Sequence, residues 1–562
     1  MNDIRRTILW VIFAFSMVLL WDKWQVHNGK KATFFPAPVT VPVAAPAAPV
    51  SPGASTVPSS TPVATDSSQV PGGAPAAAPA AARENVQVTT DVLALTFDTQ
   101  GGTLKHAEMR KYADMADKTK SFVLFDESAN RVYMAESGLI GGSFPNHKTP
   151  MQLVAGPTTL QDGQDELQIR FESADVGGVK LVKTYTLKRG AYDIGVRHEV
   201  VNASGAAVNP QLYVQLVRDG NAPPGESSMY STFTGPAVYT EAKKYQKVEF
   251  KDIEKGKADW EKTATNGYVA MVQHYFASAW LLADGIQRDI FARKVSDNLY
   301  AVGMITPLGT VEPGQSKSVE AKLFAGPQLE KTLEALAPGL ELVKDYGWLT
   351  IMAKPLYWLL DQIHSLLGNW GWSIVGLVLV LKILFYWLNA KAYASMAKMK
   401  AINPKIMEMR ERLKDKPQQM QQEMMRIYRE EKVNPMGGCL PIIIQIPVFI
   451  ALYWVLLSSV EMRNAPWIGW ITDLSSPDPY FILPVLMTLS SLLQTALNPA
   501  PPDPMQAKMM WIMPLMFSVM FFFFPAGLVM YWLTNNILSI AQQWLINTRM
   551  GVPPQFNLPK FK

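Results

Sequence analysis

Lys382 is the single charged side chain in an otherwise apolar run, residues 372–388. A helix over this run is long enough to cross a bilayer. A lysine within such a run costs roughly 2.5–3.5 kcal/mol on insertion scales, so it usually has a use or a partner. Four further apolar runs follow it and carry no charge. The position predicts a functional cation among membrane helices; a lysine that snorkels to the membrane interface is the open alternative.

Uncharged polar side chains in the other apolar runs are the remaining groups that could contact a polar ligand there. They are Gln445, Gln494, Asn535 and Asn536. Hydrogen bonding between helices is a common use of such residues, and that alternative stays open for each.

Signatures of covalent or metal chemistry are absent from the sequence. The histidines outside the apolar runs show no metal-ligand spacing, and no phosphate-binding loop or nucleophile elbow occurs. One cysteine, Cys439, excludes an intrachain disulfide and a cysteine-rich metal site. A net charge of +5 gives no indication of nucleic-acid binding. The sequence therefore predicts no enzyme, no cofactor and no nucleic acid as a specific ligand.

Six membrane-spanning helices are predicted from the apolar runs. They occupy residues 1–24, 372–388, 439–460, 480–497, 509–524 and 526–546. In the first of these segments the apolar run begins after Arg5 and Arg6, and no small-residue cleavage site follows it. We therefore interpret the segment as an uncleaved signal-anchor. Pro525 and Gly527 mark a tight reversal, because one helix through both of the last two runs would exceed the bilayer.

Basic residues predict the orientation of these helices. The connection 389–437 is rich in Lys and Arg, and the tail 547–562 holds Arg549, Lys560 and Lys562 without an acid. The loop 461–479 holds only Arg463 beside three acids. Positive loops face the cytoplasm. Both termini, the connection 389–437 and the loop 498–508 are therefore predicted to be cytoplasmic, and 25–371 and 461–479 to be periplasmic in a bacterium.

Three different segments make up the predicted periplasmic part. Residues 25–84 are rich in Pro and Ala and predict an extended linker. Residues 85–340 alternate apolar and polar side chains between turns, which predicts a large all-β sandwich. Within 341–371, apolar residues from Leu356 to Leu367 share one helical face. They predict an amphipathic helix on the outer membrane surface or, alternatively, a helix packed on the sandwich.

The cytoplasmic connection 389–437 is predicted to form a helical hairpin, broken near Pro404 and Pro417. Each half carries one short apolar stripe, and neither stripe is buried alone. The stripes are Ile406, Met409 and Leu413, and Met420, Met424 and Ile427. Their methionines suit either hairpin packing or adaptable partners, and the sequence leaves both open.

A resemblance to a known family rests on motifs between about 341 and 548. They are Lys432-Val433-Asn434-Pro435-Met436-Gly437-Gly438-Cys439 with Pro441, Gln445 and Pro447; Gly368-Asn369-Trp370-Gly371; Asp503-Pro504-Met505-Gln506; and Phe524-Pro525-Ala526-Gly527 with Tyr531 downstream. In order and spacing this region resembles the YidC-type membrane protein insertases. The anchor, linker and β domain resemble the Gram-negative branch of that family.

The resemblance implies an all-α polytopic core of six transmembrane helices, a cytoplasmic hairpin and a periplasmic β-sandwich in the inner membrane. It implies that the chain inserts and helps fold membrane proteins, alone or with the Sec translocon. The implied partners are nascent membrane proteins, the Sec translocon with its accessory subunits, ribosome–nascent chain complexes and lipid.

The resemblance also implies a hydrophilic groove, open to cytoplasm and lipid and closed to the outside. Its cation is usually an arginine, and Lys382 stands at that position. Lysine keeps the charge but lacks the planar fork that binds a carboxylate through two bonds. The other implied groove residues are Gln445, Tyr531, Trp532 and Asn535.

Two other classes of function compete with the insertase. A secondary transporter would use Lys382 to bind an anion, but the sequence offers no inverted repeat and no second intramembrane charge. A membrane-anchored enzyme or glycan binder would act through 85–340. Deleting that region would abolish the activity of the second rival, whereas an insertase would keep much of its function.

Overall fold

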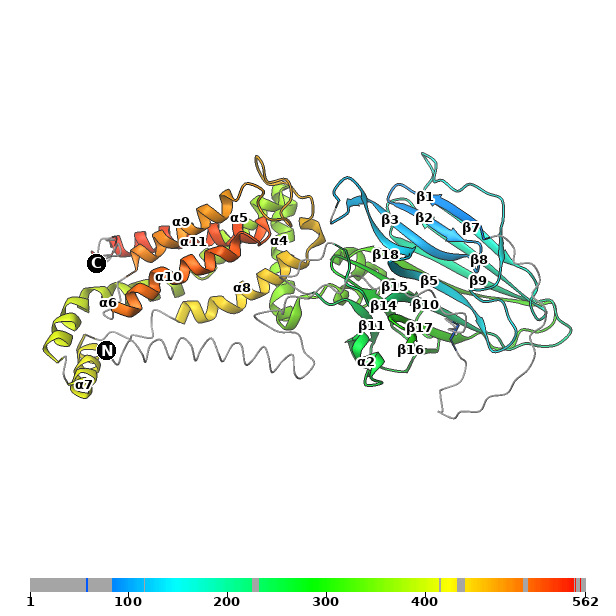
Figure 1. Ribbon diagram of the computed structural model, residues 1–562, viewed down its shortest axis with the longest axis horizontal. Coiled ribbons are helices and arrows are strands. Elements are labelled where there is room, and N and C mark those ends of the chain that lie inside the picture. The colour runs from blue at the N-terminus through cyan, green and yellow to red at the C-terminus, as the bar shows by residue number, and fades with distance from the viewer. Residues whose placement is uncertain are drawn as a thin grey trace. The chain divides into compact units, whose positions relative to one another are not determined.

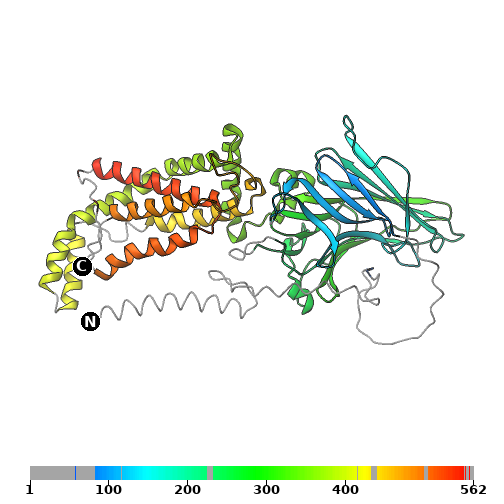
Figure 2. The ribbon, with the colours of Figure 1, turned by 45° about the horizontal axis from the view of Figure 1, so that its top comes forward.

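The computed structural model describes residues 57–58, 83–115, 117–224, 232–413, 416–431, 440–498, 504–549, 551 and 556. The predicted anchor 1–24, most of the linker 25–84, the motif 432–439 and most of the tail 547–562 lie outside the described residues. The described chain forms two compact units, one of strands that ends at Lys344 and one of helices that begins at Asp345 (Figures 1 and 2).

The strand unit contains two antiparallel sheets of nine strands each. In spatial order, the first sheet is β1 (Asn85–Thr89), β2 (Leu93–Asp98), β3 (Thr103–Ala113), β4 (Ser121–Ser128), β5 (Arg131–Ile140), β10 (Gln211–Asp219), β17 (Leu299–Pro307), β16 (Arg288–Ser296) and β13 (Thr263–Ala264). The second is β12 (Lys244–Lys247), β11 (Gly235–Thr240), β14 (Tyr268–Val272), β15 (Phe276–Leu282), β18 (Ser316–Pro327), β9 (Asp193–Asn202), β8 (Val179–Lys188), β7 (Glu166–Ser173) and β6 (Met151–Leu153). The predicted all-β sandwich is confirmed.

Short helices accompany and follow the strands. They are α2 (Phe250–Glu254), α3 (Glu330–Leu336) and the 3-10 turn η1 (Leu340–Val343). Tyr268 on β14 donates its hydroxyl to the Gly339 carbonyl at 2.7 Å, so the end of the unit is attached to the second sheet.

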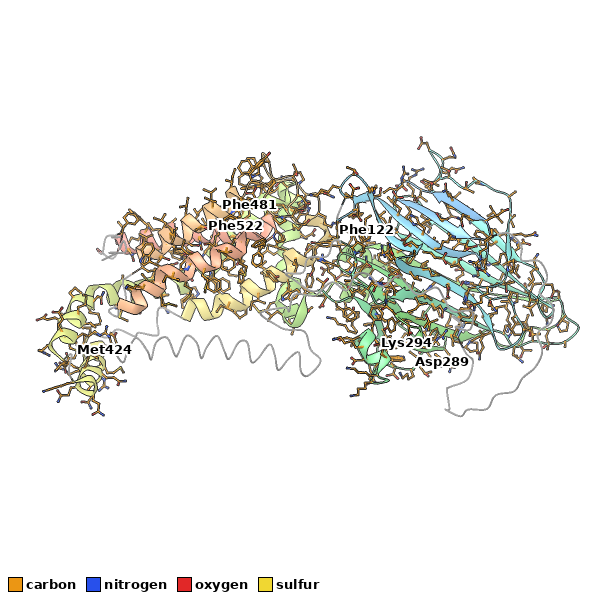
Figure 3. The ribbon with its side chains drawn as sticks, in the orientation of Figure 1. Phe122, Asp289, Lys294, Met424, Phe481 and Phe522 are labelled. Carbon is orange, nitrogen blue, oxygen red and sulfur yellow. The ribbon has the colours of Figure 1, made fainter. Side chains whose placement is uncertain are left out.

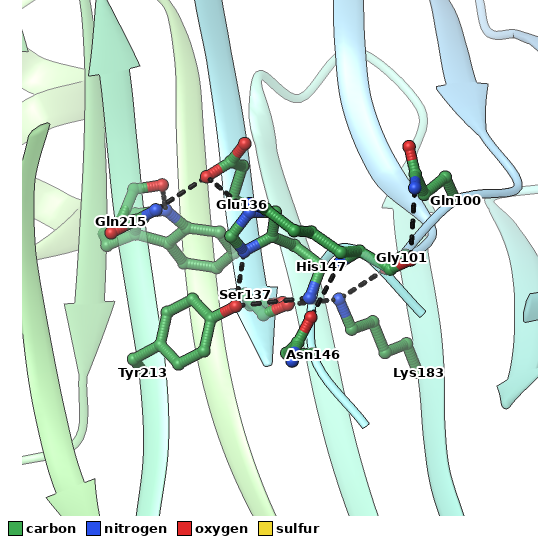
Figure 4. Close-up of polar contacts among 11 residues, drawn as sticks. Gln100, Gly101, Glu136, Ser137, Asn146, His147, Lys183, Tyr213 and Gln215 are labelled. Carbon is green, nitrogen blue, oxygen red and sulfur yellow. Dashed lines mark hydrogen bonds and ion pairs between the residues drawn. The ribbon is translucent and has the colours of Figure 1, made fainter. Parts of the chain in front are cut away.

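Polar side chains join the two sheets at the centre of the sandwich (Figure 4). Lys183 on β8 is fully buried and donates to the carbonyls of Gly101, at 2.6 Å, and Ser137, at 2.7 Å. His198 on β9 contacts the Ser137 hydroxyl at 2.8 Å. Glu136 points to the other side of β5, where it accepts a hydrogen bond from Gln215 at 2.6 Å. Because these groups are buried, their bonds fix the register between the sheets.

The helical unit contains eight helices among its described residues. The α-helices are α4 (Thr350–Leu367), α5 (Trp370–Leu384), α6 (Tyr386–Arg412), α7 (Pro417–Glu430), α8 (Leu440–Ser458), α9 (Ile482–Leu497), α10 (Pro504–Phe521) and α11 (Ala526–Arg549). Two 3-10 turns are not counted among the eight: η2 (Gly347–Leu349) precedes α4, and η4 (Val460–Met462) follows α8. No single helix within the described part is both long and apolar enough to cross a membrane. By length and composition, Trp370–Leu384 and Tyr386–Met399 meet that requirement together, across a bend of 68°.

The predicted single helix over 372–388 is wrong. The chain bends at Phe385, and α6 continues without interruption to Arg412. A break leaves backbone groups without intrahelical partners. Here α11 lies against both sides of the bend, since Lys382 contacts Ser539 and the Tyr386 carbonyl accepts from Gln542 at 3.5 Å.

The predicted hairpin stripes pack on each other. Ile402, Ile406 and Met409 of α6 are buried, and Met424 and Ile427 of α7 cover them (Figure 3 labels Met424). The predicted break near Pro404 is wrong, because α6 runs through that proline. A proline removes one helical hydrogen bond, and packing of the stripe against α7 compensates for that loss.

The amphipathic helix α4 packs within the helical unit, where it lies on α5 and α8. Leu360 of the predicted stripe is fully buried, and the Tyr357 hydroxyl donates to Glu461 at 2.6 Å. Leu367, the last residue of the predicted stripe, is 53% exposed. The opposite face carries exposed Ile351 and Trp358, which suits contact with lipid.

The reversal at Pro525 separates α10 from α11, and α11 folds back so that Trp532 packs on Phe521 with ring centroids 5.0 Å apart. The first two amides of α11 have no intrahelical partner. Those of Ala526 and Gly527 donate instead to the carbonyls of Ser476, at 2.8 Å, and Leu474, at 2.9 Å. A side chain at Gly527 would meet the Leu474 oxygen at 3.2 Å, so glycine permits this close approach.

Candidate functional site

Lys382 lies inside the helical unit, in the last turn of α5, with 8% of its surface exposed. Its ammonium donates to the Ser539 hydroxyl of α11 at 2.6 Å. No carboxylate of the described residues forms an ion pair with it within 4.0 Å. A buried cation with one neutral acceptor keeps most of its hydrogen-bonding capacity for another ligand or for water.

One face of α11 carries the polar groups that lie toward α5 and α6. Asn535, Ser539 and Gln542 follow each other at helical spacing. Ser539 contacts Lys382 of α5, and Gln542 contacts the Tyr386 carbonyl of α6. Ser539 receives the bond from Lys382 and donates to the Asn535 carbonyl at 2.7 Å. Sequence reasoning included Asn535 and Tyr531 but missed Ser539 and Gln542. The spacing from Asn535 was the signal that could have indicated both residues.

The adjacent face of α11 is polar as well, but it bonds to α9. Asn536 is buried and donates to the hydroxyls of Ser490, at 3.2 Å, and Ser491, at 3.0 Å. Gln543 donates to Asn498 at 3.2 Å. For Asn536, the sequence left open whether its side chain forms hydrogen bonds between helices. The structure shows such bonds between α11 and α9.

Replacing Asn536 with alanine is expected to destabilise the helical unit without removing insertion activity. Interhelical bonds of this kind contribute about 0.6 kcal/mol on average and at most about 1.7 kcal/mol. Unfolding of the purified protein in bicelles, measured as the free energy of unfolding, checks the loss. Asn535→Ala is the matched control, because its half-buried side chain has no hydrogen bond to the described residues. Equal losses in both variants would contradict the assigned role of Asn536.

Tyr531 and Trp532 belong to an aromatic cluster rather than to the surroundings of Lys382. Phe449 of α8 lies 5.9 Å from the Tyr531 ring and 4.2 Å from the Trp532 ring. Gln445 precedes Phe449 by one turn and is half-buried, and within the described residues no hydrogen bond joins it to another candidate. Of the five predicted groove residues, Lys382 and Asn535 lie on α5 and α11. Tyr531 and Trp532 join the aromatic cluster with Phe449, and Gln445 lies one turn from Phe449 on α8.

The end of the helical unit farther from Lys382 is held together by contacts of the loop 461–479. Asp478 is buried and accepts from the Leu483 amide at 2.7 Å and from the Trp470 indole at 3.0 Å. Asn369 donates to the Pro466 carbonyl at 3.1 Å, which ties the start of α5 to the same loop. Phe481 and Phe522, labelled in Figure 3, pack with ring centroids 5.5 Å apart. These contacts order the end of the bundle farther from Lys382.

The strand unit has a polar hollow of about 830 Å³ on the second sheet. Arg170, Arg197 and Lys322 line it together with Glu199 and Glu320. The mixed charges do not select one sign of ligand. Across the described residues, no group of three His, Cys, Asp or Glu side chains could hold a metal.

Comparisons with known proteins cover both units. The family model described as the YidC periplasmic domain matches residues 85–359, and the one described as the 60Kd inner membrane protein matches 362–552. A membrane protein insertase YidC of Ralstonia nicotianae is 56% identical over 549 residues, with 98% of each chain covered. That of a Janthinobacterium is 52% identical over 564 residues, covering 98% of this chain and 100% of the relative. A crystal structure of an active YidC insertase shares 20% identity and covers 82% of this chain and 92% of its own, with a TM-score of 0.38.

A helical unit with a buried cation, joined to a β-sandwich and matched by models for an inner membrane protein and its periplasmic domain, defines a class of bacterial inner membrane protein. The chain belongs to the YidC family of membrane protein insertases.

Proposed function

We propose that this membrane protein insertase, which is not an enzyme, carries polar client segments through a groove in which Lys382 supplies the positive charge. The observation that supports the proposal is the buried ammonium of Lys382, held by Ser539 and free of any carboxylate among the described residues. An acidic or polar flank of a client costs several kcal/mol to place in hydrocarbon. A nearby cation lowers that cost.

The client's apolar segment supplies the driving force. Hydrophobic transfer releases roughly 25 cal/mol per Å² of apolar surface that leaves water. Exposed apolar residues line α8 and α10, including Ile446, Ile512 and Met516. We propose that the segment slides along α8 and α10 into lipid while its flank passes Lys382.

We further propose that Lys382 is positioned by Ser539 and that Asn535, Tyr531, Trp532 and Gln445 extend the groove. Both termini and the α6–α7 hairpin would face the cytoplasm, where the hairpin could meet ribosome–nascent chain complexes. The Sec translocon, its accessory subunits and lipid would be the partners in the membrane.

Site-specific photocrosslinking to stalled nascent chains of a small membrane protein tests the proposal. Probes replace Ile446 and Met516 on the α8 and α10 surfaces, and a matched probe replaces the equally exposed Val485 on α9. We expect crosslinks to the client's apolar segment from α8 and α10 and few from α9. Uniform crosslinking, or none from α8 and α10, would contradict the proposed path.

A flux assay in sealed vesicles distinguishes the insertase from the alternative function, a secondary transporter in which Lys382 binds an anion. The proposed groove uses no path for small anions through the membrane, so purified protein should leave anion permeability unchanged. A flux that disappears in Lys382→Met would make Lys382 a ligand site of a transporter.

A further inference from the structure

The Pro- and Ala-rich linker touches the strand unit at one described point, Val57 and Pro58. Val57 is half-buried and Pro58 is buried. Val57 packs against a cluster of Ile140, Tyr213 and Ile305 on the first sheet, and Phe291 packs against the same cluster. In Figure 1 this short blue piece lies beside β16 and β17. We call these four side chains the linker patch.

The linker patch lies on the face of the first sheet that points away from the second. Tyr213 and Ile305 are direct partners on β10 and β17, and Gln211, two residues before Tyr213, pairs with Ile140 on β5. Side chains alternate along each strand. Since Ser137 of β5 contacts His198 of the other sheet, the side chains at even numbers on β5, including Ile140, face outward.

Two features hold the linker patch rigid. Gly138, directly opposite Tyr213, has no side chain and so permits the close approach of Asn146, since an added Cβ would lie 2.6 Å from the Asn146 Cα. The Tyr213 hydroxyl accepts from the His147 amide at 3.2 Å and contacts its ring, so the tyrosine ring is held in place. The patch therefore presents two aromatic rings and two isoleucines in a fixed arrangement.

Such a patch suits a segment containing proline. Proline-rich chains dock on aromatic-lined surfaces at low entropic cost because their extended conformation is already formed. The linker cannot build a core of its own. Docking gives its Val57 and Pro58 a place to bury apolar surface and covers Ile140, Tyr213 and Ile305, which are at most 8% exposed.

We propose that the linker patch is a docking site for the chain's own linker, occupied in cis by Val57 and Pro58. We identify the linker as the occupant because Val57 packs against the patch, and this identification does not depend on the proposed groove. Docking divides the linker into a part before residue 57 and a part between residue 58 and β1. The free length between the predicted anchor and the β domain becomes about half of that of an undocked linker, which shortens the domain's reach.

The sequence offers a matched control, because the dipeptide Val-Pro occurs again at Val70-Pro71. The test uses the full chain in membranes with Cys439→Ser, Ile305→Cys and either Val57→Cys or Val70→Cys. A short thiol crosslinker is added, and trypsin then cuts at Lys31 and Arg83. We expect the linker fragment to stay covalently attached at least fivefold more often through residue 57 than through residue 70.

Equal attachment through the two positions would overturn the proposal, and so would a product that joins two chains. A second variant, Val57→Asp, leaves the folded strands untouched. Hydrogen exchange at the end of β5 and of β17 should become at least threefold faster in Val57→Asp and stay unchanged in Val70→Asp. Unchanged exchange in both variants would likewise overturn cis docking.

Discussion

Insertion of a client with an acidic flank is expected to fall about tenfold when Lys382 is replaced by methionine. Methionine keeps the length and the apolar part of the side chain and removes only the charge. A cation and a carboxylate about 7 Å apart at an effective dielectric constant of 20 attract by roughly 2 kcal/mol. Part of that attraction is screened by water in the groove, and about 1.4 kcal/mol corresponds to a tenfold change in rate. Protease protection of a client synthesised on proteoliposomes measures the insertion rate.

Three comparisons make this prediction specific. Lys382→Arg keeps the positive charge and should insert at nearly the normal rate. A client with a neutral flank should lose less than twofold in Lys382→Met. Ser539→Ala should cost about threefold, because the ammonium loses its one described partner, 2.6 Å away, but not its charge. Full insertion of the acidic client by Lys382→Met would rule out the groove cation.

The sandwich was predictable because its signal is local. Leu167, Ile169 and Phe171 alternate with polar residues, and all three are at most 2% exposed in β7. Buried polar groups follow the same alternation, since Lys183 lies between Leu181 and Tyr185, whose side chains also point inward from β8. The alternation predicts which face of the sheet a side chain lies on but not which groups it contacts. The carbonyls that Lys183 binds come from residues distant in the sequence, so the network could not be predicted.

The polar contacts around Lys382 were predictable only in part, for a similar reason. A charge in an apolar run stands out, so Lys382 was found from its own helix. Ser539 is an ordinary helix residue until α5 and α11 are placed side by side. The bend at Phe385 has no Pro or Gly to signal it. Both sides of the bend contact α11, and no pattern within 372–388 contains those contacts.

Acid is expected to destabilise the strand unit through two buried histidines. Burial lowers the pKa of His198 to about 3, and burial also lowers the pKa of His147 to about 3. The 3.7 Å contact between His147 and Glu136 is therefore not an ion pair at neutral pH, because the imidazole is uncharged. Below about pH 6.5 the unfolded chain binds a proton at each histidine that the folded chain does not. Each histidine thus lowers the free energy of unfolding by about 1.4 kcal/mol per pH unit as the pH falls toward 3.

Glu136 acts in the opposite direction. Burial raises its pKa to about 7, although the hydrogen bond from Gln215 opposes that rise. Between about pH 4.5 and 7 the folded state holds a proton on Glu136 that the unfolded state has lost, so this group adds stability as the pH falls. The effects of the two histidines exceed that of the one glutamate. The free energy of unfolding therefore falls by about 1.4 kcal/mol for each pH unit as the pH is lowered from 6.5 to 4.5. Lys183 contributes only at higher pH, because burial lowers its pKa to about 7 and its usual pKa is 10.5.

The variant His198→Gln gives the sharpest form of this expectation. One histidine then opposes Glu136, and the stability of the strand unit should be nearly independent of pH between 6.5 and 4.5. Hydrogen exchange of β5, β8 and β9 in the full chain, divided by the intrinsic exchange rate at each pH, yields the unfolding free energies. His106→Gln is the control, since His106 is half-buried beside Asp126 at 3.5 Å and lies outside the buried network of His198, Lys183 and Glu136. If His198→Gln kept the full slope, the acid sensitivity would have to come from surface carboxylates, and the buried network of the sandwich would be insensitive to pH in this range.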